Sequence, residues 1–244
     1  MGCVSPPRDL IKPMKASVLS LVLAVGFSVG ARADFTIVQK VEGKGQTNQM
    51  TLKLKGDRVR METTPKMTVI VDGKTGDTIT LMNVEKKVIR ISGDKAKAIA
   101  EMAAKYGGTT SEKPKLVATG KKTTINGYEA EEYVGETDKF KASYWIAPKF
   151  PDSAALLKQL QAVIPTAWND LAKGMLDYRD LPGFPLRTHV RMEGDEITST
   201  VITVKQDPLS EAEFAVPKDF QEMKIPNMKE TSGDEPTPAP PPRP

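Results

Sequence analysis

The sequence is poor in the residues on which most catalytic and metal sites depend. Cysteine and histidine each occur once among 244 residues, as Cys3 and His189. A serine or cysteine nucleophile needs a neighbouring base, and zinc sites are built from several Cys and His ligands. Gly73 and Gly76 do not form a phosphate loop, because Thr68 stands where its first glycine would be. We therefore expect no enzyme, with no catalytic residue, metal or cofactor.

Large aromatic side chains are also scarce, at 6% of the sequence. A β domain with so few of them is expected to be underfilled. The sequence has 11 methionines, and several of them fall on the inward side of predicted strands. The unbranched side chain of methionine adapts to irregular or changeable apolar ligands. Ordinary core packing is the alternative reading for any single methionine.

The N-terminal region has the pattern of a secretory signal peptide. Lys15 is followed by an uncharged run over 16–29, and a small-residue stretch ends at Ala33. This run is shorter than the ~20 residues that a membrane span needs. We predict residues 14–33 to be a signal peptide cleaved after Ala33, and 1–13 to be an upstream extension from a misassigned start. The protein is then exported to the periplasm.

The charge of the expected mature chain is nearly balanced. Removing residues 1–33 takes away four basic side chains and one acidic side chain, which lowers the formal net charge from +4 to +1. No basic patch indicates nucleic acid as a partner. Residues 229–244 are polar and rich in proline, so we expect a disordered tail. A contact of this tail with the cell envelope or a partner protein is the alternative.

The first half of the remaining chain predicts a meander of antiparallel strands. Alternating apolar residues or short apolar runs, separated by turn residues, mark six strands. They cover 35–41, 50–55, 59–62, 67–71, 78–82 and 88–91. A helix over 94–106 follows, with Asp94 as its expected N-cap. We treat 34–228 as a single domain, because strands resume directly after this helix.

The second half repeats the pattern around one hairpin. Asn126-Gly127 is typical of a two-residue type I′ turn, and it joins strands on either side. A third strand is expected over 140–147. A helical segment over 153–176 should kink or split at Pro165. A last hairpin over 186–206 completes a mainly antiparallel α+β fold, in which Asn126-Gly127 is expected between the two halves of one sheet.

The order of these parts resembles that of a known family. The resemblance rests on the strand pair from Thr119 to Tyr133, the Tyr144-Trp145 strand, the LPGFPLR turn over 181–187 and the Phe-Ala-Val-Pro motif at 214–217. The chain thus resembles exported bacterial proteins of domain of unknown function 4412 and, more distantly, the periplasmic lipoprotein-carrier (LolA/LolB-like) superfamily. The resemblance implies a strongly curved, incomplete barrel of about 10–11 strands, with helices covering its mouth. It also implies lipids or lipoprotein acyl chains as ligands.

These arguments lead to one functional hypothesis and one alternative. We expect a non-enzymatic binding or carrier protein whose hydrophobic ligand lies in the cavity of the half-barrel. The expected ligand-binding residues are Leu52, Leu54, Met61, Val69, Ile79, Leu81, Ile89 and Ile91, with Ile164 and Trp168 on a helical lid. The alternative is an envelope sensor or assembly protein that acts through protein–protein contacts at a sheet edge or the proline-rich tail.

Overall fold

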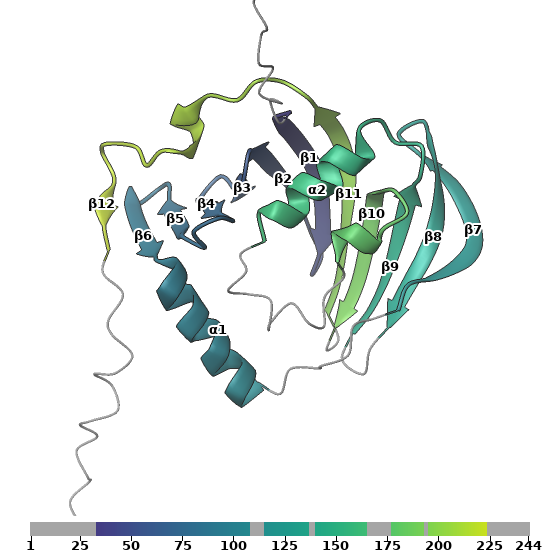
Figure 1. The fold of residues 1–244 in the computed structure, drawn as a ribbon, viewed down its shortest axis with the longest axis horizontal. Helices are drawn as coiled ribbons and strands as arrows, with labels where there is room; N and C mark the ends of the chain where they lie inside the picture. Colours follow the sequence, from purple (N-terminus) through teal and green to yellow (C-terminus); the bar gives the residue numbers. More distant parts are fainter. Residues whose placement is uncertain (1–32, 108–114, 137–139, 165–176, 193–194, 224–244) are drawn as a thin grey trace, which may run out of the picture. The chain divides into compact units, whose positions relative to one another are not determined.

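The computed structural model describes residues 33–107, 115–136, 140–164, 177–192 and 195–223. These residues form one sheet of twelve strands and two α-helices (Figure 1). The strands are β1 Phe35–Gly43, β2 Gln46–Lys55, β3 Arg58–Thr64, β4 Met67–Asp72, β5 Thr78–Met82, β6 Lys87–Ile91, β7 Val117–Ile125, β8 Tyr128–Glu136, β9 Phe140–Ala147, β10 Phe184–Met192, β11 Asp195–Lys205 and β12 Gln221–Glu222. The helices are α1 Gly93–Gly107 and α2 Ser153–Ala162, with short 3-10 helices η3 Tyr178–Asp180 and η4 Glu211–Phe214.

The sheet consists of two meanders that meet at its centre. The strand order is β12-β6-β5-β4-β3-β2-β1-β11-β10-β9-β8-β7, and every pair is antiparallel except β12 with β6. The first strand therefore pairs with the last long one, along a register from Thr36–Lys205 to Gly43–Ile197. Because β12 and β7 stand at opposite edges, the sheet of the described residues is open. The prediction of a mainly antiparallel sheet is confirmed. The described residues form 12 strands, where about 10–11 were expected.

The hairpin around Asn126-Gly127 has the predicted turn but a different place. Both residues have positive φ, 50° and 82°, as a type I′ turn requires. The turn joins β7 to β8 at an edge of the sheet, however, so the expectation that it separates two halves is wrong. The β1–β11 pairing has that role. It joins residues about 160 positions apart, which no local pattern reveals.

One face of the sheet is covered by α2, and we call it the α2 face. Leu54, Val59 and Val71 share this face by strand register and are almost fully buried. They belong to one core with the α2 residues Leu156 and Leu160. The helix ends at Ala162, before Pro165, where a kink or split of the helical segment was expected, and residues 165–176 of that segment lie outside the described residues. Burial of this stripe is the main reason that α2 is held on the sheet.

Two turns of the sheet touch α2 closely. The Gln159 side-chain amide donates a hydrogen bond of 3.1 Å to the carbonyl oxygen of Gly56, in the β2–β3 turn. At Gly73, after β4, a Cβ atom would lie 2.0 Å from the carbonyl oxygen of Ala162. Glycine is thus required at this position so that the turn can approach the C-terminus of the helix.

Replacing Gly73 with alanine should push α2 away from the sheet. Because the added methyl group meets helix backbone, it cannot be accommodated by a side-chain rotation. We expect the free energy of unfolding to fall by about 1–3 kcal/mol, the usual cost of overpacking. Urea denaturation followed by circular dichroism measures this. The neighbouring exposed Lys74→Ala serves as control, and an equal effect of both substitutions would contradict the close approach.

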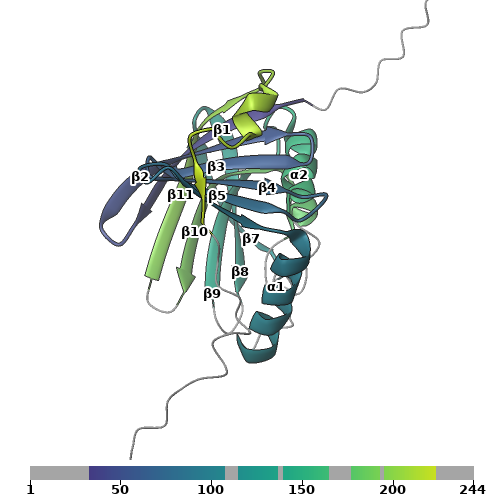
Figure 2. The same cartoon turned by 90° about the vertical axis from the view of Figure 1, so that its left-hand side faces the viewer.

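The opposite face of β3–β6 is covered by the chain after β11. We call residues 206–223 the strap, and the face beneath them the strap face; Figure 2 shows the strap and α2 on opposite sides of these strands. Phe214 of the strap is 6% exposed and packs with Ile70, Leu81 and Val88. Phe214, the first residue of the Phe-Ala-Val-Pro motif, is therefore a buried anchor. The edge strand β12 comes later in the chain.

The first helix differs slightly from its prediction. It begins at Gly93, and the Ser92 hydroxyl accepts a hydrogen bond from the backbone N–H of Lys95. Ser92 therefore occupies the capping position, and the expected N-cap Asp94 lies in the first turn. None of the helices in the described ranges is both long and apolar enough to cross a membrane. The predicted signal peptide, residues 14–33, lies outside these ranges except for its last residue.

Candidate functional site

The α2 face carries three parallel rows of side chains across the first six strands. In the first two rows, neighbouring residues are direct cross-strand partners, and the third row consists of two such pairs, so the side chains of a row point the same way. The first row is Phe35, Leu54, Val59, Val71, Thr78 and Ile91. The second is Ile37, Leu52, Met61, Val69, Thr80 and Ile89. The third contains Gln39, Met50, Met67 and Met82.

Along β2, β3 and β4, exposure increases from the first row to the third, whereas Ile37 of β1, in the second row, stays buried at 1%. In the first row, Leu54 is fully buried and Val71 is 2% exposed. In the second row, Leu52, Met61 and Val69 are only partly buried. In the third row, Met67 is 40% exposed. The helix therefore covers one end of the strands and leaves the apolar side chains further along them accessible.

Methionine is concentrated on this uncovered part of the face. Met50, Met61, Met67 and Met82 come from four adjacent strands and belong to the second and third rows. The predicted inward position of several methionines is thus confirmed by the register. A surface with four flexible thioether side chains can adjust to apolar groups of different shape.

The structure brings together six of the eight strand residues predicted to bind a ligand. Leu52, Leu54, Met61, Val69, Ile89 and Ile91 all lie on the α2 face. Leu54, however, is fully buried in the core beneath α2.

The remaining two strand residues require a correction. Ile79 and Leu81 are the cross-strand partners of Ile70 and Thr68, so they lie on the strap face. There Leu81 is 1% exposed in the core formed with Phe214, and Ile79 packs against the same core. The strap, not a cavity, explains why these positions are apolar.

Of the two residues predicted to lie on a helical lid, the structure describes Ile164 but not Trp168. Ile164 follows α2 directly and is partly buried, with its backbone N–H donating to the carbonyl oxygen of Gln161. Trp168 lies outside the described residues.

Tyr133 and Tyr144 lie on the α2 face in the second meander, and Tyr178 of η3 lies close to Tyr144. Tyr144 of β9 is the cross-strand partner of Tyr133 and Thr188. Burial, and then the proximity of Tyr178, raise the pKa of Tyr144 to about 12. Burial also raises the pKa of Tyr178. The hydroxyls of Tyr144 and Tyr178 are therefore neutral at physiological pH. Neutral hydroxyls suit an apolar surface and do not suit a general base.

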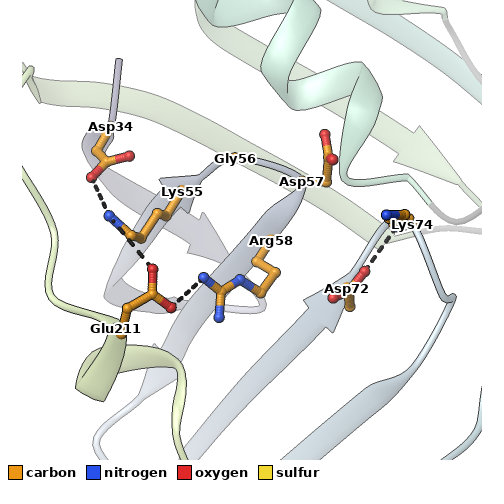
Figure 3. A pocket seen from close by; sticks show the side chains of 8 residues that line it. All are labelled: Asp34, Lys55, Gly56, Asp57, Arg58, Asp72, Lys74 and Glu211. Atoms are coloured by element: carbon orange, nitrogen blue, oxygen red, sulfur yellow. Dashed lines mark hydrogen bonds and ion pairs between the residues drawn. The ribbon is translucent and has the colours of Figure 1, made fainter. Parts of the chain in front are cut away.

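A polar hollow of about 360 Å³ lies where the strap meets β2 and β3 (Figure 3). Its charges form ion pairs: Arg58 Nη2 lies 2.6 Å from Glu211 Oε2, and Lys55 Nζ lies 2.9 Å from Asp34 Oδ2. Asp34 also accepts a hydrogen bond of 2.8 Å from the backbone N–H of Leu209. The residue that would begin the mature chain thus helps to hold the strap. The hollow is thus a structural junction in which Asp34, Lys55, Arg58 and Glu211 pair with one another.

The strap should loosen in acid. Hydrogen bonds from Arg58 and Lys53, respectively, lower the pKa of Glu211 and of Glu213. Carboxylates with a lowered pKa stabilise the fold above their ordinary value of 4.5, and this contribution is lost as the pH falls through the folded-state pKa. We expect the urea concentration at the unfolding midpoint to decrease as the pH is lowered below 4.5. In Glu213→Gln this decrease should be less steep. An equal slope in both proteins would argue against the contribution of this pair.

The described residues contain no cluster of His, Cys, Asp or Glu that could hold a metal ion. His189 faces away from the α2 face, and its Nδ1 lies 2.9 Å from the Thr198 hydroxyl. Glu132 of β8 pairs with Lys121 at 3.2 Å and accepts a hydrogen bond from Thr119. Both groups therefore have structural partners.

An open, mainly antiparallel sheet with a helix on one face and a strap on the other defines the class of fold. The family described as "Domain of unknown function (DUF4412)" matches residues 35–220. The chain belongs to this family, as its motifs predicted. Among curated proteins, none matches the sequence.

Solved structures with a similar arrangement have low sequence identity. PNGF-II is 12% identical with a TM-score of 0.40; the match covers 81% of this chain and 32% of PNGF-II, about a third of its length. The Mycobacterium tuberculosis lipoprotein LppX is 11% identical (TM-score 0.38; 72% and 88% covered). A LolA superfamily protein from Nitrosomonas europaea is 10% identical (TM-score 0.30; 75% and 90% covered). At these scores the similarities carry no functional assignment.

Proposed function

We propose that the protein is a non-enzymatic, exported binding or carrier protein for a hydrophobic ligand, a lipid or the acyl chain of a lipoprotein. The ligand lies on the second and third rows of the α2 face. The observation that carries this proposal is the increase in exposure from the row beneath α2 to Met67. Sheet faces that serve only as core are normally covered along their whole length.

The chemistry of the rows supports an elongated apolar ligand. Leu52, Met61 and Val69 are successive partners beside the buried first row, and beyond Thr80 the row reaches Ile89 on the sixth strand. Each methylene group that such a ligand buries contributes ~0.8 kcal/mol. The face offers few polar groups to fix a headgroup, which favours a ligand that is recognised mainly by its hydrocarbon part.

The half-barrel form and a helical lid are part of this proposal. The open sheet would curve around the ligand, with α2 closing one end of the apolar face. Ile164, directly after α2, and Trp168 would approach the ligand from the side of the helix. The signal peptide pattern up to Ala33 supports the periplasm as the place of action.

A fluorescent fatty acid titrated into the purified protein tests the binding function. We expect saturable binding with an increase in fluorescence, and displacement by an unlabelled fatty acid of the same length. A soluble dicarboxylic acid of similar length, which has charges at both ends, should displace it poorly. Equal displacement by both competitors would argue against an apolar binding face.

A further inference from the structure

A second hollow, of about 460 Å³, lies on the face of the sheet opposite the rows, over the four adjacent strands β1, β11, β10 and β9. It is lined by Lys40, Glu42, Ser143, Trp145, Arg187, His189, Thr198 and Thr200. None of these residues belongs to the strap junction or to the apolar rows. The fold therefore has a polar concavity for which neither the core nor the proposed lipid site accounts.

Strand register arranges the lining residues as two short rows. Trp145, Arg187 and Thr200 are successive cross-strand partners, and the row ends at Lys40. Ser143, His189 and Thr198 form the neighbouring row, which ends at Glu42. Adjacent strands are ~4.8 Å apart, so an aromatic ring, a guanidinium group, an imidazole and three hydroxyls face one small area.

Arg187 is distinctive among the arginines of the described residues. Arg58, Arg60, Arg90, Arg179 and Arg191 each have a carboxylate oxygen within 4 Å. Within the same ranges Arg187 has only a hydrogen bond of 3.3 Å from its Nε to the Thr200 hydroxyl. Its two terminal nitrogens can therefore donate to a ligand.

The neighbours of Arg187 are held in place. His189 Nδ1 is hydrogen-bonded to the Thr198 hydroxyl, which directs the ring and leaves Nε2 for a ligand. Trp145 is partly exposed, and it also packs against the hydrophobic core. Lys40 is neutralised by Glu42, 3.0 Å away. The positive charge without a carboxylate partner in the hollow is thus that of Arg187.

This set of groups fits a sugar ring that carries an acid. The C–H face of a pyranose is apolar and packs on an exposed indole, while its hydroxyls exchange hydrogen bonds with Ser and Thr side chains. A carboxylate on the ring matches the planar fork of a guanidinium. We propose that this hollow binds an acidic saccharide, a pyranose chain bearing carboxylate groups. The site is independent of the lipid-binding face.

Calorimetric titration of the purified protein with tetragalacturonic acid tests this site, with the methyl ester of the same tetrasaccharide as the uncharged counterpart. We expect the acid to bind about tenfold or more tightly than the ester, the usual effect of a hydrogen-bonded charge. Arg187→Gln should remove this difference. Arg191→Gln, on the same strand and face but paired with Glu196, should leave the affinity unchanged.

Three results would overturn the proposal. Equal binding of acid and ester would exclude recognition of the carboxylate. Equal losses in Arg187→Gln and Arg191→Gln would indicate general charge attraction. Competition by inorganic phosphate as strong as that by the saccharide would indicate a simple anion site. Trp145→Ala adds a test of ring stacking, and if this variant does not fold, the arginine comparison still decides the question.

Discussion

Replacing Phe214 with alanine is expected to lower the free energy of unfolding by about 3–5 kcal/mol, the usual cost of removing a buried phenylalanine. Phe214 is 6% exposed and is the strap residue that is buried together with Ile70, Leu81 and Val88. The guanidinium of Arg58 also lies 5.0 Å from the centre of its ring. Both contacts are lost in the alanine variant.

Guanidinium chloride denaturation measures this effect, and Val84→Ala is the matched control. Val84 is 67% exposed in the β5–β6 turn, so its truncation should change the free energy by less than about 0.5 kcal/mol. If Phe214→Ala has the same small effect as the control, the strap does not stabilise the sheet. Because the strap covers the face opposite the rows, ligand binding should persist in the folded variant.

The second large effect concerns the ligand. A carboxylate placed in the second row by Met61→Glu should weaken fatty-acid binding at least about tenfold, because burying an unpaired charge against hydrocarbon is costly. Met67→Glu makes the same test at a residue that is already 40% exposed, where folding is less at risk. Met61→Leu keeps the apolar character and should bind normally.

A control for charge itself is available on β11. Ile202 is 48% exposed and lies outside the three rows, so Ile202→Glu adds the same charge away from the proposed site. Fluorescent fatty-acid titration of these variants separates the alternatives. Equal weakening by Ile202→Glu and Met61→Glu would mean that net charge, and not the α2 face, governs binding.

Local patterns were sufficient for most of the strands. Alternation and turn residues predicted β5 with its observed bounds, and the other five strands of the first meander to within a few residues. The Asn126-Gly127 turn was also predictable, because few residues adopt positive φ at two successive positions. The β1–β11 pairing was not, because it joins distant segments and depends on the whole fold.

The faces of β5 show why the candidate site was only partly predictable. In Thr78-Ile79-Thr80-Leu81-Met82 the more apolar alternate set is Ile79 and Leu81, so alternation places them inside. Register instead pairs Thr80 with Val69 and turns Ile79 and Leu81 towards the strap. Both faces of β5 are covered or apolar. Alternation shows which face of a strand is buried only when the other face is exposed to solvent.

The second hollow, which Arg187 and Trp145 line, was not predicted from the sequence for a related reason. Strand alternation predicts that His189 and Val190 point to opposite faces, but it does not show which arginine lacks a carboxylate partner. Arg187 and Arg191 occupy equivalent positions of one strand, and they differ because Glu196 of β11 reaches only Arg191. That distinction depends on side-chain geometry between strands.

The most direct test of the central claim is extraction and mass spectrometry of the gently purified protein. The proposed function predicts a co-purified lipid or other acyl-chain molecule in the wild-type protein, and its loss in Met61→Glu. A wild-type protein that contains no such molecule, and that also fails to take up a fluorescent fatty acid, would contradict ligand binding on the α2 face.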